Sequence, residues 1–172
     1  IPVYNEADVI GNSIHAACTI DYPNYEVVIV NDGSSDGTSE VINGFVGAGM
    51  VRVVNKATNE GKALAINDAL PCLNGEIVLI IDADAELEPS ALRYMVTHFR
   101  SGRVAAVAGN PRVKNVETFL ARLQLIEFTS IVSLLRRAQR VWGRVITVSG
   151  VVAAFRKSAL IDVGMFSPDM PT

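Results

Sequence analysis

Two aspartates, Asp82 and Asp84, are the residues best suited to chemistry in this sequence, because they directly follow an apolar run that ends at Ile81. A spacing of two puts both carboxylates on the same side of an extended chain. Two like charges that close raise each other's pKa unless a cation lies between them. Carboxylate oxygens suit Mg²⁺ or Mn²⁺ better than zinc, so we expect one of these two ions there, with diphosphate oxygens and water as its remaining ligands.

A second polar stretch, residues 31–38, follows an earlier apolar run. Its glycines permit positive φ, and Asp32 would face the crevice beyond the strand, where it could accept bonds from a ribose hydroxyl or a base N–H. The alternative is a plain tight turn in which Ser34, Ser35 or Asp36 caps the following helix. The residues alone leave both interpretations open.

A third polar group, residues 59–62, precedes a predicted helix. Lys62 at the start of that helix could bind a phosphate with help from backbone N–H groups, or it could simply be solvated. Tyr4 and Glu6 follow the first predicted strand and could hold a flat base in the same crevice by stacking and hydrogen bonding.

Short β-branched runs that alternate with helical stretches must position these residues. Residues 1–4 are interpreted as the end of a strand whose beginning is missing, and we expect the chain to be an excerpt of a longer protein. Further strands are predicted at residues 25–30, 51–54, 76–81 and 104–108, and helices at about 7–19, 38–45, 62–73 and 89–99. This order predicts an α/β fold, a mostly parallel sheet with helices on both faces.

The composition fits one compact domain, since 172 residues with 49% apolar and 19% charged side chains can bury a sizeable core. Two cysteines, Cys18 and Cys72, make a disulfide scaffold or a four-ligand zinc site improbable and favour a reducing compartment. No apolar run approaches the roughly 18 residues that span a bilayer, so nothing here is expected to cross a membrane by itself.

Charge divides the chain in two. Residues 1–111 hold 6 basic and 14 acidic side chains and residues 112–172 hold 9 and 4, which gives −8 and +5 of the total −3. An acidic half suits cations and a basic half suits phosphates or an anionic surface, unless both are solvated faces of one domain.

One long helix is predicted from Glu117 to about Trp142. It would either pack on the core or lie on a membrane surface, and its basic end comprises Arg136, Arg137, Arg140 and, just beyond it, Arg144.

Five motifs, in this order, resemble the inverting nucleotide-sugar glycosyltransferases, the family of cellulose, chitin and hyaluronan synthases. They are residues 1–6, residues 30–36, residues 59–62, Asp82-Ala83-Asp84 and Ser149-Gly150. The resemblance implies a Rossmann-like, glycosyltransferase A-type fold that binds a nucleotide sugar, with Asp82 and Asp84 holding the diphosphate through Mg²⁺ or Mn²⁺. The residues that it assigns to the nucleotide sugar are Pro2, Tyr4, Glu6, Asp32, Lys62 and Asp82.

A finer resemblance, to bacterial poly-β-1,6-N-acetylglucosamine synthases of biofilm exopolysaccharide, lies in residues 124–128, 136–140 and 147–157. It implies transfer of N-acetylglucosamine from UDP-GlcNAc to a growing β-linked polysaccharide, with residues 1–111 as the donor part and 112–172 as a truncated acceptor part. The general base would lie beyond Thr172, so no catalytic residue falls within the chain. The implied acceptor residues are Ser149, Gly150, Gln124 and Glu127.

The same resemblance implies a location on the cytoplasmic face of the bacterial inner membrane, with membrane segments outside this chain and no nucleic-acid partner. A chitin-oligosaccharide or hyaluronan-type synthase, or an inactive nucleotide-sugar-binding module, is the alternative. An aspartyl-phosphate phosphatase fits poorly, because Glu86 stands where that chemistry needs threonine or valine. A nicotinamide dehydrogenase lacks its Gly-x-Gly-x-x-Gly turn.

Overall fold

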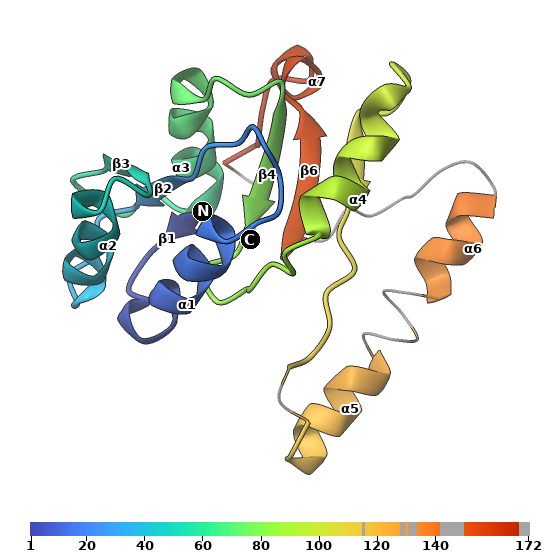
Figure 1. Cartoon of the computed structure of the whole chain (residues 1–172), viewed down its shortest axis with the longest axis horizontal. Helices are drawn as coiled ribbons and strands as arrows, with labels where there is room; N and C mark the ends of the chain where they lie inside the picture. Colours follow the sequence, from blue (N-terminus) through green and yellow to red (C-terminus); the bar gives the residue numbers. More distant parts are fainter. Residues whose placement is uncertain (115, 128–129, 131–133, 142–149, 169–172) are drawn as a thin grey trace.

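The computed structural model describes residues 1–114, 116–127, 130, 134–141 and 150–168 (Figure 1). The strands are β1 (Pro2–Val3), β2 (Val28–Asn31), β3 (Arg52–Asn55), β4 (Ile77–Ile81), β5 (Ala106–Ala108) and β6 (Val152–Arg156). The helices are α1 (Ala7–Cys18), α2 (Thr38–Gly47), α3 (Lys62–Ala69), α4 (Ala91–Thr97), α5 (Phe119–Glu127), α6 (Leu135–Val141) and α7 (Lys157–Asp162), with short 3₁₀ turns η1 (Leu70–Cys72) and η2 (His98–Arg100).

The strands form two three-stranded sheets. In the first, ordered β1-β2-β3, all pairs are parallel, with Pro2 opposite Val30 and Val28 opposite Arg52. In the second, ordered β4-β6-β5, the central strand β6 runs antiparallel to both neighbours. The predicted α/β class with a parallel sheet is confirmed. Strand β6 was not predicted, and it is the strand that reverses direction.

Alternation along β2 explains why helices cover both faces of the first sheet. Ile29 belongs to a buried cluster with Ile10 of α1 and Ile42 of α2. Its neighbour Val30 belongs to another cluster with Ala65 of α3. Because successive side chains of a strand point to opposite faces, an uninterrupted apolar strand needs a helix on each side.

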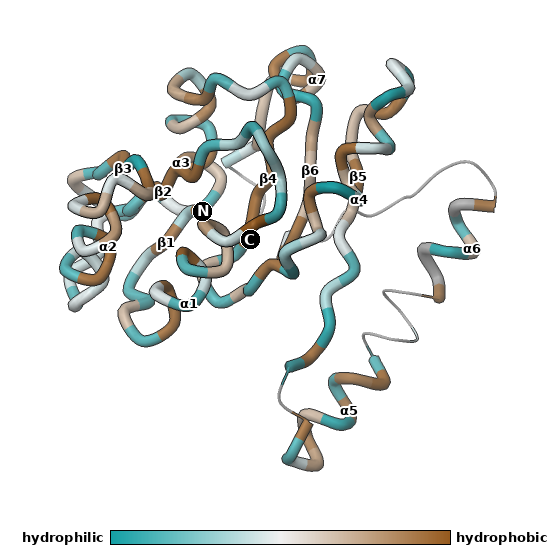
Figure 2. Tube along the Cα trace, viewed as in Figure 1, coloured by the Kyte–Doolittle hydropathy of each residue, from teal (hydrophilic) through white to brown (hydrophobic). Residues whose placement is uncertain are grey.

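Strand β4 follows the same rule in the second sheet. Ile81 packs in a cluster with Met95 of α4, whereas Ile80 packs in a cluster with Ile66 of α3 and Leu160 of α7. Figure 2 shows hydrophobic residues along both β4 and α3. Helix α3 therefore contributes to the core of both sheets, and its first residue, Lys62, is held at a fixed place between them.

A cavity of about 600 Å³ lies between β2 and β4 and is lined mainly by apolar side chains, among them Val28 and Leu79. The backbone nitrogen of Ile1 donates a hydrogen bond of 2.8 Å to the Val28 carbonyl there. Of the six predicted nucleotide-sugar residues, Pro2 is the one that lines this cavity. The cavity is thus apolar and separate from the polar strand ends.

Helices α5 and α6 lie apart from the sheets in Figure 1. No residue of α5 is buried, and Phe119 and Leu120 are 78% and 74% exposed.

The predicted single helix from Glu117 to Trp142 stays a prediction, because residues 128–129, 131–133 and 142 lie outside the described part. Arg136, Arg137 and Arg140 belong to α6, whereas Arg144 is also outside it. No helix in the described ranges is long and apolar enough to span a bilayer.

We expect Ile29→Ala to lower the free energy of unfolding by about 2–5 kcal/mol, because it removes a fully buried side chain that α1 and α2 both contact. Val46→Ala, at a 39% exposed position of α2, is the matched control and should change the free energy of unfolding by only about 0.5 kcal/mol. Urea unfolding followed by circular dichroism measures both. Equal losses in the two variants would contradict this arrangement of the core.

Candidate functional site

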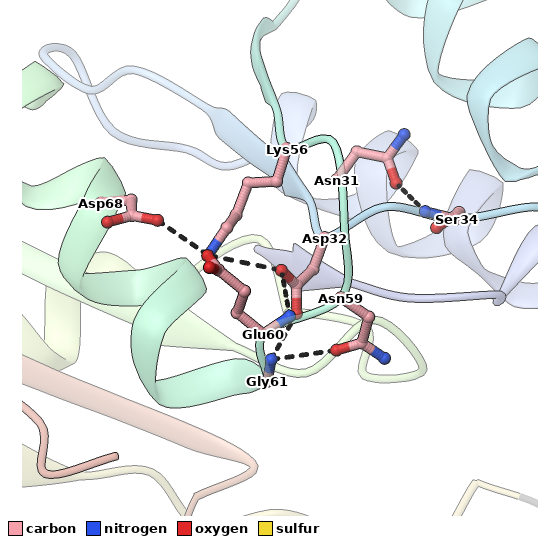
Figure 3. Close-up of polar contacts among 8 residues, drawn as sticks. All are labelled: Asn31, Asp32, Ser34, Lys56, Asn59, Glu60, Gly61 and Asp68. Atoms are coloured by element: carbon pink, nitrogen blue, oxygen red, sulfur yellow. Dashed lines mark hydrogen bonds and ion pairs between the residues drawn. The ribbon is translucent and has the colours of Figure 1, made fainter.

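Asp32 follows β2 and is only 3% exposed. Its carboxylate accepts two backbone N–H groups, from Gly61 at 2.8 Å and from Glu60 at 3.2 Å (Figure 3). Its own backbone N–H donates to the Val3 carbonyl at 2.9 Å. The polar stretch after β2 and the polar group before α3, which are far apart in sequence, therefore meet at this carboxylate.

Lys56, directly after β3, provides the cation for this buried acid. Its ammonium lies 3.5 Å from Asp32, 2.6 Å from Glu60 and 2.8 Å from Asp68, and its side chain is 8% exposed (Figure 3). Burial alone would lower the pKa of Lys56, but the ion pairs with Asp68 and Glu60 outweigh burial and raise the pKa above its ordinary value. Lys56 is charged at any ordinary pH.

The turn after β2 is fixed from within by Asn31. This buried side chain donates to Ser39 Oγ at 2.9 Å and to Asn55 Oδ1 at 3.3 Å, and its own Oδ1 accepts the Ser34 N–H at 3.1 Å. Gly33 then adopts a φ of +73°, and a Cβ there would lie 2.6 Å from the Thr58 carbonyl carbon. The turn packs so closely on the segment before α3 that only glycine fits.

The loop that carries Tyr4 and Glu6 is tied to the same turn. The Glu6 N–H donates to Thr38 Oγ1 at 2.9 Å, and the Ala7 N–H donates to Asp36 Oδ2 at 3.2 Å. Asp36 Oδ1 also accepts the Thr38 N–H at 2.9 Å, but the N-cap residue of α2 is Gly37, and the alternative in which Ser34, Ser35 or Asp36 caps this helix is not confirmed. Both side chains, Tyr4 and Glu6, are exposed beside Asp32's turn and free to meet a ligand.

Lys62 and Asp82 join the two sheets. The Lys62 ammonium forms an ion pair with Asp82 Oδ1 and also donates to the Gly150 carbonyl at 3.2 Å. The Asp82 N–H donates to the Val151 carbonyl at 3.0 Å. The start of α3, the end of β4 and the residues before β6 thus meet at one point, where the side chains of Lys62 and Asp82 are 28% and 27% exposed.

Asp84 lies two residues after Asp82 and is exposed. Two carboxylates at this spacing supply the hard oxygen ligands that Mg²⁺ or Mn²⁺ prefers, so the donor set fits either ion. Within the described ranges, no three His, Cys, Asp or Glu side chains are grouped closely enough to hold a metal. A divalent ion would therefore need further oxygens, and a diphosphate offers them.

The predicted acceptor residues are less closely grouped. Gly150 touches Lys62 through its carbonyl, but Ser149 lies outside the described residues, as do Phe128 and Thr172. Gln124 and Glu127 are exposed on α5, which lies apart from the strand ends in Figure 1.

Sequence reasoning missed Lys56 and Asp68. The available signal was position, because Lys56 is the first residue after a strand that runs parallel to β2 and so ends at the same sheet edge as Asp32. Asp68 offered no such signal, since it lies in the last turn of α3 and only the fold brings it to Lys56.

A family model described as Glycosyl transferase family 2 matches residues 1–164. A poly-beta-1,6-N-acetyl-D-glucosamine synthase of Staphylococcus epidermidis is 38% identical over 170 residues, which are 98% of this chain and 41% of that protein. The synthase of Staphylococcus aureus strain MSSA476 is 36% identical, with the same shares. The chain spans less than half the length of these curated relatives.

Two solved structures resemble the fold. A mannosyltransferase of Pyrobaculum calidifontis, in complex with GDP-Man and Mn²⁺, has a TM-score of 0.82 and 30% identity, covering 98% of this chain and 46% of that one. Residues 1–349 of TarS from Staphylococcus aureus, in complex with UDP-GlcNAc, have a TM-score of 0.67 and 21% identity, covering 96% and 46%. The second likeness supports the fold alone.

We expect Gly33→Ala to lower the free energy of unfolding more than Gly49→Ala does. Both glycines have a positive φ, +73° and +72°, so alanine suffers the same backbone strain of about 1–2 kcal/mol at either position. Only at Gly33 does the new Cβ also meet backbone, whereas nothing lies within 4 Å of a Cβ at Gly49. Urea unfolding of both variants gives the difference. Equal losses would mean that the turn does not pack on the Thr58 segment.

Proposed function

The chain belongs to glycosyl transferase family 2, and from this membership we propose that it binds the nucleotide-sugar donor of an inverting N-acetylglucosaminyltransferase that extends a β-linked polysaccharide. The names of the staphylococcal relatives support N-acetylglucosamine as the sugar. The observation that carries the proposal is the convergence of Asp32, Lys62 and Asp82 at the carboxyl ends of β2 and β4, where open parallel sheets bind ligands.

In this proposal the uridine lies against the loops after β1 and β2. Asp32 accepts a hydrogen bond from the base, Tyr4 and Glu6 flank it, and Pro2 supports their loop from β1. The side chains of Tyr4 and Glu6 are exposed, and the backbone of their loop donates a hydrogen bond to Thr38, which follows the turn that carries Asp32. Tyr4 and Glu6 therefore have a fixed position relative to Asp32. A site of this kind needs little rearrangement to bind, and preorganisation favours affinity.

The diphosphate would lie at the end of β4, where Asp82 and Asp84 would hold Mg²⁺ or Mn²⁺ and Lys62 would add a positive charge. A divalent ion bound there stabilises the negative charge that develops on the leaving diphosphate. The Mn²⁺ in the complex of the similar mannosyltransferase supports a divalent ion. Lys62 and Asp82 form an ion pair with each other, and both side chains are partly exposed and so within reach of a ligand.

The reaction that we propose is a single displacement. An acceptor hydroxyl attacks the anomeric carbon from the side opposite UDP, and the proton goes to a base that lies beyond Thr172. Residues 1–111 would form the donor part and residues 112–172 the acceptor part, with Gly150 beside the donor ion pair and Ser149, Gln124 and Glu127 toward the acceptor. A role in biofilm polysaccharide and a place at the cytoplasmic face of the inner membrane complete the proposal.

We predict that UDP stabilises the intact protein in the presence of Mn²⁺ and does little in EDTA. UDP brings further negative charge to a site that already holds Asp82 and Asp84, so its binding needs the cation. At about 100 times its dissociation constant, UDP should add roughly 2.7 kcal/mol to the stability of the folded domain. For a domain of this size the melting temperature rises by about 5–11 °C, which differential scanning fluorimetry measures.

Asp84→Asn should remove most of the Mn²⁺-dependent part of this rise. Asp162→Asn, an exposed carboxylate of α7 outside the site, is the matched control and should leave the rise intact. If UDP stabilises the protein equally with Mn²⁺ and in EDTA, the aspartate pair is not a diphosphate-metal site.

A further inference from the structure

Asp32 is a nearly fully buried carboxylate, and burying such a charge is costly unless a cation or hydrogen-bond donors compensate it. The Lys56 ammonium stands 3.5 Å from it, and two backbone N–H groups donate to it (Figure 3). Lys56 is itself buried, with 8% of its side chain exposed. Its charge therefore acts on Asp32 with little screening by solvent.

Lys56 is also fixed in position, from two sides. Glu60 lies 2.6 Å from its ammonium and belongs to the loop whose N–H groups bind Asp32. Asp68 lies 2.8 Å away on α3. One ammonium thus links the end of β3, the loop before α3 and the helix itself to the carboxylate. Removing it would leave three acidic side chains, Asp32, Glu60 and Asp68, repelling one another around a loop that has lost its anchor.

The charge state of Asp32 decides which base it can bind. An ionised carboxylate only accepts hydrogen bonds, whereas a protonated one also donates. Uracil presents an N–H donor at N3, where cytosine presents a lone pair. A carboxylate held in place at position 32 therefore suits uracil and repels cytosine, and a displaced carboxylate loses that preference.

We propose that Lys56 is a positioning residue for base selection, which compensates the charge of Asp32 and keeps its carboxylate aligned so that the donor site prefers uracil to cytosine. The inference rests on the proposed function, since it needs the base to lie at Asp32. Lys56 itself touches no ligand. The competing view is that Lys56 only stabilises the connection between β3 and α3, in which case its loss would weaken the fold and all nucleotides alike.

The test compares Mn²⁺-dependent binding of UDP and CDP to the intact protein by titration calorimetry, at a temperature where circular dichroism shows each variant folded. In Lys56→Met we expect UDP affinity to fall roughly tenfold, about the loss that weakening one hydrogen bond to a charged group causes, with CDP affinity nearly unchanged. Lys56→Arg retains the charge and should recover part of the preference. Lys157→Met removes another partly buried lysine, bound to the Leu73 carbonyl at 2.6 Å at the far end of β4, and should change neither affinity.

Asp68→Asn keeps the test decisive if Lys56→Met does not fold. Asp68 is half exposed and makes no contact with Asp32 in Figure 3, yet it holds Lys56, so its loss should lower the UDP preference in the same direction. An unchanged ratio of UDP to CDP affinity in the folded Lys56 and Asp68 variants would overturn the inference. If the unaltered protein binds no UDP, the proposed function itself fails, which is a different result.

Discussion

A carboxylate buried at the end of β2 is the constraint on which this site depends. A carboxylate charge at 3% exposure needs partners, and the chain supplies them from one stretch, Lys56 to Gly61, that is far from Asp32 in sequence. Gly33 must then be glycine, because the turn that aims Asp32 presses against the Thr58 backbone. The loop that carries Tyr4 and Glu6 is also held beside that turn, because the Glu6 N–H donates a hydrogen bond to Thr38 Oγ1. The contacts that compensate the buried Asp32 carboxylate thus fix the positions of most of the residues around the crevice.

A second contact joins this crevice to the other sheet. Lys62 reaches from α3 to Asp82 after β4 and to Gly150 before β6. Helix α3 can do this because its apolar side chains pack against both β2 and β4, which fixes its first residue between them. The antiparallel direction of β6 matters as well, since it brings the start of that strand beside the end of β4. Donor and acceptor parts of the proposed enzyme would therefore share one ion pair.

The sequence predicted what depends on local pattern. Asp32 and Asp82 were found because each follows an apolar strand, and α1, α2 and α3 begin where they were expected. Strand β6 was missed because Val-Ala-Ala-Phe-Arg holds only one β-branched residue. It forms a strand because it pairs with β4, where Arg156 lies opposite Ile77, 79 residues earlier in the sequence. Lys56 and Asp68 were missed because their meeting depends on the same kind of long-range packing.

A crystal structure of the intact protein with UDP and Mn²⁺ tests the central claim most directly, namely that Asp32 and the pair Asp82 and Asp84 form the two ends of one donor site. The account predicts the uracil within hydrogen-bond distance of the Asp32 carboxylate, and Mn²⁺ between the diphosphate and the aspartates after β4. Uracil bound away from Asp32, for example in the apolar cavity between β2 and β4, would contradict it.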